Sequence, residues 1–366
     1  MTQLGIGLIG AGFIADLHAE AFARVPEATV RVVAARDAGR ARAFADERGI
    51  PDATGDWQAV LERSDVDIVC VCVPNHLHRE VTVAAAQAGK HVICEKPLAR
   101  TLADADAMIE ACEAAGVRLM YGEMICFAPK YVRAKGLIDE GALGRVFQIK
   151  HGEQHFGPHS AWFWDGTQSG GGVMMDMGCH GIEVIRWMYG RPPIESVTAE
   201  LGTYVHGERT DLDDHANVVI RFAGNRVGII ETSWAKPGGM HDGIEILGSG
   251  GVTYADLLRG SSLLTYSEQG YGYAVEKAGD TRGWTHTIYE ETWNYGFPQE
   301  MAHFVDCVLH DREPIVTAAD GRVVLEAVYA AYRSAGTGQR VTFPLQLTDA
   351  ERAASPIELW RAPAPA

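Results

Sequence analysis

Short apolar runs alternate with alanine-rich stretches over about the first 120 residues of the chain. The apolar runs predict strands at 4–9, 29–34, 68–73, 92–94 and 118–121. The stretches between them, 15–23, 38–48, 79–88 and 103–115, have helical periodicity. Glycine closes several of these stretches, as it does at a helix C-cap. This alternation predicts an α/β fold with a doubly wound parallel sheet.

Beyond Pro129 the strand signals become longer and alternate between apolar and polar residues. Strands are expected at 145–156, 196–205, 217–222 and 226–234, with one helix at 173–189 between them. Gly224-Asn225 suits a hairpin turn between the last two strands. We therefore expect a second, α+β domain built on a mostly antiparallel sheet.

The chain has 366 residues, more than one hydrophobic core usually supports, so two domains are expected. We expect the first domain at 1–124, the second at 125–297 and closing helices at 298–345. The helices, at 298–309 and 319–332, should pack back on the first domain or bridge the two. The Ala/Pro-rich tail 362–366 is expected to be frayed.

The composition of the chain argues against some classes of partner and indicates a cellular compartment. A formal net charge of −16 argues against nucleic acid and membrane surfaces as partners. No run of apolar residues is long enough for a transmembrane helix, and the apolar stretch 4–14 lacks the basic start of a signal peptide. The seven cysteines include no C-x-x-C pair, which favours free thiols in the cytoplasm over disulfides or a zinc site.

A glycine-rich turn follows the first expected strand. It contains Gly10-x-Gly12-x-x-Ala15, in which Gly10 permits a tight turn and Gly12 lets the backbone approach a pyrophosphate. The helix that begins near Phe13 and Ile14 offers free N–H groups to the phosphates. The position between a strand and a helix predicts a Rossmann domain that binds NAD or NADP.

The choice between the two cofactors depends on the end of the second expected strand. NAD sites usually hold the ribose 2′-hydroxyl with an acidic residue there, whereas this chain has Ala35 followed by Arg36. Arg36 and Arg40 could pair with a 2′-phosphate, which favours NADP. A shift of one residue would place Asp37 at the acidic position, so NAD stays open.

Two further segments follow expected strands at the edge where such sheets bind ligands. Pro74, Asn75 and His78 are expected to lie beside the cofactor, although an ordinary turn with surface histidines is the alternative. The second segment is Glu95-Lys96-Pro97. Lys96 can polarise a substrate hydroxyl during hydride transfer, and Glu95 can orient it.

A third constellation opens the expected helix of the second domain. Asp176 and His180 are four residues apart and would share a helix face. A histidine that accepts a hydroxyl proton beside a carboxylate suits an alcohol oxidation. Two such residues do not make a metal site, and no metal is expected. Asp176 and His180 are therefore candidates for both catalysis and substrate binding.

Aromatic, histidine and acidic residues interleave over 153–165. Such a mixture suits a polyhydroxylated ring, because aromatic rings stack on sugar C–H faces and polar groups hold the hydroxyls. His155, His159 and Trp162 are the candidates for substrate contact, although an ordinary core role is an alternative for each.

Together Gly10-x-Gly12-x-x-Ala15, Glu95-Lys96-Pro97 and Asp176-x-Gly-x-His180 resemble the signatures of the glucose–fructose oxidoreductase/inositol dehydrogenase/MocA (Gfo/Idh/MocA) family. The resemblance implies NAD(P)-linked chemistry at a sugar or polyol carbon, with Lys96, Asp176 and His180 catalytic. It also implies an open second sheet that supports a homodimer or homotetramer. Where many members carry Asn-x-Arg, this chain has Glu123, which favours a neutral polyol or sugar over a sugar acid.

Three functions remain in contention. The first is a dehydrogenase in which His180 exchanges the proton, Lys96 polarises the hydroxyl and Asp176 orients the histidine, with Lys96 and His180 able to exchange duties. The second is a redox-neutral glycosidase or lyase that oxidises a sugar transiently and keeps its cofactor bound. The third is a sensor of the NADP/NADPH ratio, which would need neither Lys96 nor the Asp176/His180 pair.

Overall fold

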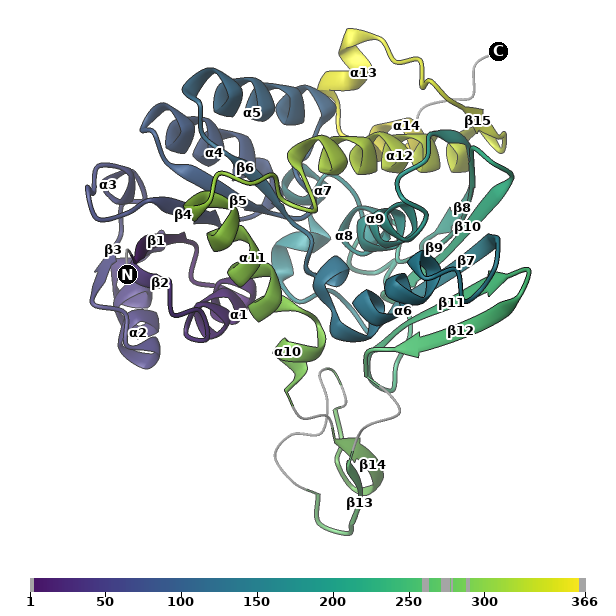
Figure 1. The fold of residues 1–366 in the computed structure, drawn as a ribbon, viewed down its shortest axis with the longest axis horizontal. Helices are drawn as coiled ribbons and strands as arrows, with labels where there is room; N and C mark the ends of the chain where they lie inside the picture. The colour runs from purple at the N-terminus through teal and green to yellow at the C-terminus, as the bar shows by residue number, and fades with distance from the viewer. Residues whose placement is uncertain (1–2, 259–262, 271–276, 278, 288–289, 362–366) are drawn as a thin grey trace. The chain divides into compact units, whose positions relative to one another are not determined.

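The computed structural model describes residues 3–258, 263–270, 277, 279–287 and 290–361 (Figure 1). The chain divides into two compact units, Met1–Met124 with Gly296–Leu325 and Ile125–Tyr295 with Glu326–Ala366. Helix α12 (Ala318–Thr337) begins in the first unit and ends in the second. The expected frayed tail 362–366 lies outside the described residues.

The first unit contains the doubly wound parallel sheet that the sequence predicts. Its strands are β1 (Leu4–Ile9), β2 (Ala28–Ala34), β3 (Asp52–Thr54), β4 (Ile68–Val71), β5 (His91–Glu95) and β6 (Leu119–Gly122). The order β3-β2-β1-β4-β5-β6 reverses direction between β1 and β4. In such a sheet the carboxyl ends of the strands at this reversal form the ligand site. The short, polar β3 gave no strand signal in the sequence.

Helices connect these strands. They are α1 (Phe13–Phe22), α2 (Ala38–Arg48), α3 (Gln58–Leu61), a 3₁₀ turn with α4 (His78–Gln87), and α5 (Leu102–Ala115). The later helix α11 (Phe297–Leu309) packs against α1. Strand side chains such as Ile6, Leu8 and Ile68 have no exposed surface. Burying each of them contributes about 1.5–3 kcal/mol, which holds the strands in register.

The second unit is built on a seven-stranded mixed sheet of order β12-β11-β7-β10-β9-β8-β15. Its strands are β7 (Val146–Gln154), β8 (Ile194–Gly202), β9 (His215–Phe222), β10 (Arg226–Ser233), β11 (His241–Gly248), β12 (Gly251–Asp256) and β15 (Val341–Thr342). Only β7 and β10 pair in parallel; the other neighbours are antiparallel. The mostly antiparallel second sheet is therefore confirmed.

Several elements of the second unit differ from the expectation or were not expected. The single helix expected at 173–189 is two helices, α8 (Val173–Asp176) and α9 (Gly178–Met188), which meet at Met177. Helix α9 contacts β7 and β10. Strands β11 and β12 were not expected. The remaining elements are α6 (Pro129–Asp139), α7 (Gly166–Ser169), the hairpin β13 (Leu263–Ser267)–β14 (Gly283–Thr287), α10 (Glu291–Asn294), α13 (Asp349–Ala353) and α14 (Ile357–Arg361).

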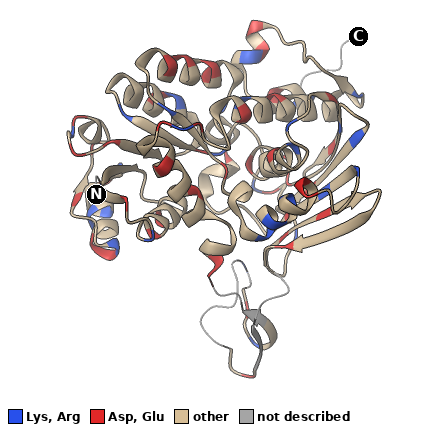
Figure 2. Cartoon of the chain, in the orientation of Figure 1, with Lys and Arg blue, Asp and Glu red and all other residues tan. Residues whose placement is uncertain are grey.

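Acidic and basic positions are interspersed over the helices of both units (Figure 2). None of the helices in the described part of the chain is long and apolar enough to cross a membrane. The seven cysteines are buried free thiols.

Candidate active site

The glycine turn between β1 and α1 has the geometry of a dinucleotide site. Gly10 has φ +122°, and a Cβ at this position would lie 2.1 Å from the Cys72 carbonyl oxygen. Gly12 precedes α1, and a Cβ there would meet no atom within 4 Å. Gly10 is thus needed by the fold, whereas Gly12 leaves open space in front of the helix N-terminus. Phe13 is exposed and Ile14 half-buried at the start of that helix.

The segment after β2 places one cation against this turn. The Arg40 guanidinium donates hydrogen bonds of 3.1 and 2.9 Å to the Ala11 carbonyl oxygen. Asp37 caps α2, since its carboxylate accepts the Arg40 N–H at 2.6 Å. Arg36 is exposed and Ala35 half-buried. The Asp37 carboxylate therefore already has a structural partner, and the cation of Arg40 is held against the glycine turn.

The segment after β4 is tied to the loop that follows β5. Asn75 is buried and Pro74 half-buried. The His78 ring nitrogens lie 2.9 Å from the Val73 carbonyl oxygen and 3.1 Å from that of Pro97. Burial lowers the pKa of His78, whereas the contacts with backbone carbonyl oxygens raise it by less. These contacts give His78 a clear structural role in joining the two loops.

Glu95 is the last residue of β5, and Lys96 follows it directly. Glu95 is buried and Lys96 is half-buried. One Glu95 oxygen lies 2.6 Å from His18 Nε2, and the other accepts the Lys96 backbone N–H at 3.2 Å. His18, on α1, was not among the predicted site residues. Its place six residues after Gly12 gives no chemical signal until the fold brings α1 beside β5.

Other ionisable groups of the first unit surround this pair. The Cys72 sulfur lies 3.7 Å from His18 Nδ1. Burial and the charge of Glu95 raise the pKa of Glu300, on α11, well above its ordinary value. Glu123, directly after β6, is fully buried and also raises the pKa of Glu300. Glu123 was predicted to contact substrate.

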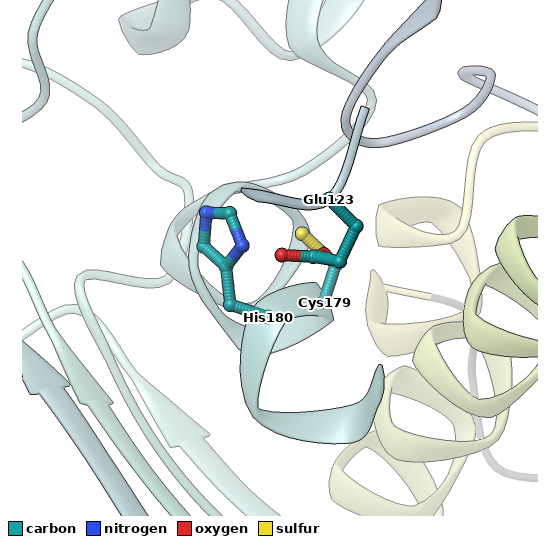
Figure 3. Close-up of side chains that lie close together, drawn as sticks. All are labelled: Glu123, Cys179 and His180. Atoms are coloured by element: carbon teal, nitrogen blue, oxygen red, sulfur yellow. The ribbon is translucent and has the colours of Figure 1, made fainter. Parts of the chain in front are cut away.

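Asp176 and His180 lie at the junction of α8 and α9 in the second unit. Both side chains are buried. Cys179 and His180 project from the first turn of α9, drawn in Figure 3 together with Glu123. The two predicted residues are thus not on one continuous helix, because Asp176 ends α8 and His180 belongs to α9.

Trp234 orients Asp176. Its indole N–H donates a hydrogen bond of 3.1 Å to Asp176 Oδ2. The Trp234 ring contacts Phe163 and Trp164 edge-on at centroid distances of 6.2 and 5.4 Å. The sequence did not single out Trp234 as a site residue; its position directly after β10 was the one available signal.

The aromatic and histidine segment after β7 packs around the same region of the second unit. His155 is fully buried and lies edge-on to His159 at 4.7 Å between ring centroids. Burial, followed by the charge of His159, lowers the pKa of His155 to about 3. The half-buried Trp162 stacks on Phe163 at 3.8 Å. His155 is therefore a neutral hydrogen-bonding group over the whole physiological range of pH.

Gly172 approaches the buried Asp213 closely. Asp213 accepts the Gly172 N–H at 3.0 Å and the Met174 N–H at 2.8 Å. A Cβ at Gly172 would lie 2.0 Å from the Asp213 backbone oxygen. The Tyr332 hydroxyl also donates to Asp213. Asp213 therefore fixes the start of α8, which carries Asp176.

A buried polar group beneath α9 was not predicted. Asp242 Oδ1 accepts the Tyr131 hydroxyl at 2.6 Å and lies 3.2 Å from His151 Nε2. Glu153 lies opposite Asp242 across β7 and β11. The ligand atoms of His151, Glu153 and Asp242 all lie within 4.8 Å of one another. The hydrogen bonds to Asp242 join α6, β7 and β11.

Comparison with known proteins matches both halves of the chain. A family described as "Oxidoreductase family, NAD-binding Rossmann fold" matches residues 4–123, and the "GFO/IDH/MocA C-terminal domain" matches residues 131–254. A curated relative, the myo-inositol 2-dehydrogenase of Thermotoga maritima, is 30% identical over 333 residues, which cover 90% of this chain and 95% of the relative.

Solved structures agree with this match. GenD2 from gentamicin A biosynthesis, in complex with NAD, has a TM-score of 0.88 and 32% identity, covering 94% of this chain and 97% of its own. Levoglucosan dehydrogenase with NADH and levoglucosan has a TM-score of 0.80 and 27% identity, covering 94% and 100%. The glycine turn, the lysine after β5 and the paired domain matches lead to one conclusion: the chain belongs to the Gfo/Idh/MocA family of oxidoreductases, with an NAD-binding Rossmann domain.

Proposed function

We propose that this enzyme transfers hydride between a CH–OH carbon of a sugar or cyclic polyol and a nicotinamide cofactor. The observation that carries the proposal is that both family domains match a chain that also has Lys96 after β5 and the Asp176/His180 pair at the α8–α9 junction. Relatives named for inositol and levoglucosan oxidation support the substrate class.

A nicotinamide held by the cofactor site would accept the hydride from the alcohol carbon. In the oxidation, His180 would take the O–H proton of the alcohol as the carbonyl forms. Lys96 polarises the reacting hydroxyl and stabilises its developing negative charge. Asp176, held by the Trp234 N–H, orients His180 and stabilises the imidazolium. In the reduction the same groups act in reverse.

The remaining predicted residues are assigned to binding. We propose that Gly10, Gly12, Phe13, Ile14, Pro74, Asn75, Glu95 and Lys96 form the cofactor site. Substrate hydroxyls would be held by His155, His159, Trp162 and Glu123 together with Asp176 and His180. The neutral His155 suits this role, because one ring nitrogen can donate and the other accept.

The test is a panel of inositols and neutral sugars with NAD and NADP separately, following nicotinamide absorbance. We expect turnover in the wild-type enzyme and a loss of at least a hundredfold in Lys96→Met at saturating cofactor. Wild-type turnover in Lys96→Met would disprove the assigned role. If product forms while no reduced cofactor accumulates, the redox-neutral reaction replaces the dehydrogenase.

We also propose a preference for NADP over NAD. Ala35 leaves the position of the usual ribose-binding acid without a carboxylate, and Arg40 is held against the glycine turn. The exposed Arg36 adds a second cation for a 2′-phosphate. We expect Arg36→Ala to raise the KM for NADP at least tenfold and Ala35→Asp to favour NAD. Two solved relatives hold NAD or NADH. Equal values of kcat/KM for NAD and NADP in the wild-type enzyme would contradict the proposed preference for NADP.

The open face of the seven-stranded sheet supports a homodimer or homotetramer. Val219, Val252 and Tyr254 on its strands are 42%, 48% and 70% exposed. These side chains share one face of the sheet, with Lys150 and Glu245 between Val219 and Tyr254 in the register. Exposed apolar side chains on a sheet face favour association. Light scattering should give an oligomer for the wild type and a monomer for Tyr254→Lys with Val252→Lys. The buried free thiols fit the reducing cytoplasm, which fractionation of the native host would test.

A further inference from the structure

The buried pair His18–Glu95 connects the two functional segments of the first unit. His18 lies on α1, the helix that begins at the glycine turn, and Glu95 precedes Lys96 at the end of β5. Both side chains are buried, and His18 Nε2 lies 2.6 Å from Glu95 Oε1. The pair therefore joins the cofactor-phosphate helix to the loop that carries the proposed catalytic lysine.

The ionisation of the pair follows from its surroundings. Burial by itself lowers the pKa of His18, but the Cys72 sulfur and the Glu95 carboxylate raise it well above its ordinary value. Burial raises the pKa of Glu95, but the hydrogen bond and charge of His18, together with Lys96, lower it below its ordinary value. These shifts favour an imidazolium paired with a carboxylate, and the raised pKa of Glu300 favours the protonated form of its side chain.

Each polar atom of the pair holds a different segment. His18 Nδ1 faces the sulfur of Cys72, whose carbonyl oxygen is the atom that a Cβ at Gly10 would strike. Glu95 Oε2 accepts the backbone N–H of Lys96. Phe297 and Glu300 of α11 cover the cluster, with the Phe297 ring 6.2 Å from that of His18. Glu123 after β6 lies near the cluster as well, since its charge raises the pKa of Glu300.

We propose that His18 is a positioning residue that fixes Lys96 for the reaction through the carboxylate of Glu95. This inference rests on the proposed role of Lys96. A charge-assisted hydrogen bond in a buried site restricts Glu95 to one rotamer, so the amide of Lys96 keeps one orientation. Without the imidazolium, Glu95 is a buried carboxylate that lacks its counter-charge, and its side chain rearranges or takes up a proton.

The test is a cycle of His18→Gln and Lys96→Met, singly and together, under single-turnover conditions with saturating cofactor. We expect His18→Gln to slow hydride transfer at least tenfold, with cofactor Kd changed less than threefold. In the Lys96→Met background it should slow the reaction less than twofold further, because its effect acts through the lysine. His91→Gln, at the other end of β5, is the matched control and should retain wild-type rates.

Two results would overturn the proposal. One is a folded His18→Gln enzyme within twofold of the wild-type rate, and the other is an equal loss in both backgrounds, which indicates a purely structural role. If His18→Gln does not fold, Glu95→Gln replaces it in the cycle, and its hydride-transfer rate is compared in the wild-type and Lys96→Met backgrounds in the same way. Full activity in Lys96→Met contradicts the proposed function itself, whereas an inactive Lys96→Met with an unaffected His18→Gln contradicts only the positioning role.

Discussion

Alanine at Gly12 should separate cofactor binding from stability. The backbone of Gly12 has φ −106° and ψ −169°, an extended conformation that alanine adopts without strain. A Cβ there meets no protein atom within 4 Å. The methyl group would instead occupy the space through which a pyrophosphate approaches the helix N-terminus.

The expected magnitudes follow from this geometry. Gly12→Ala should change the free energy of unfolding by less than about 1 kcal/mol, with a small gain expected because alanine restricts the unfolded chain. Cofactor affinity should fall at least tenfold, which corresponds to about 1.4 kcal/mol. Gly10→Ala is the contrasting variant. Its φ of +122° and a 2.1 Å approach to Cys72 predict a loss of stability of about 3 kcal/mol or more.

Urea denaturation without cofactor measures the free energy of unfolding. Fluorescence titration with NAD and NADP independently measures cofactor affinity. The matched pair should give a stable Gly12→Ala protein with weak binding and a destabilised Gly10→Ala protein. A stable Gly12→Ala variant with wild-type affinity for both cofactors would refute the assignment of the turn as a phosphate site. A strongly destabilised Gly12→Ala variant would refute the open space in front of α1.

Three further predictions concern the second unit. Trp234→Phe removes the hydrogen bond to Asp176 and should lower the free energy of unfolding by about 1.5–3 kcal/mol in urea denaturation. Trp164→Phe is the control. An unchanged free energy of unfolding in Trp234→Phe would contradict the prediction. His155 has a pKa of about 3 in the folded protein, below the ordinary 6.5. Between these two pH values the unfolded chain binds one more proton than the folded protein. The free energy of unfolding should therefore rise with pH in this range by up to about 1.4 kcal/mol per pH unit. His155→Gln should reduce this slope in urea titrations at pH 4–6, and an identical slope would contradict the neutral ring. Asp213→Asn removes a carboxylate that accepts two backbone N–H groups. It should lower the free energy of unfolding by about 2 kcal/mol or more in urea denaturation. A free energy of unfolding equal to that of the wild type would contradict this prediction.

The sequence predicted five of the six strands of the Rossmann sheet because each of these five is a largely buried apolar run. Strand β1 and helix α2 have the expected bounds. The failures have a local cause. Strand β3 has three residues with no apolar run, and the break at Met177 lies within a stretch that is buried on all sides, so periodicity carries no signal there.

Some residues of the candidate site could likewise be proposed from the sequence, and others could not. Residues that follow strands in sequence, such as Lys96, could be identified because the carboxyl edge of a parallel sheet is known in advance. His18 and Trp234 contact residues 77 and 58 positions away. The position of Trp234 after β10 was a local signal, but nothing in the sequence indicated the partner of either residue. His78 has the residue type of a ligand-binding group, yet its ring lies against backbone carbonyls of two loops.

Isotope transfer tests the central claim most directly. A sugar or inositol that the enzyme converts would be deuterated at the carbon that carries the reacting hydroxyl, and the cofactor would be analysed by mass spectrometry after one turnover. We predict that deuterium appears in the reduced nicotinamide, with a slower rate than for the unlabelled substrate, and that Lys96→Met suppresses the transfer. Product formation in which the label is absent from the cofactor and retained or exchanged in the product would contradict net hydride transfer to the nicotinamide.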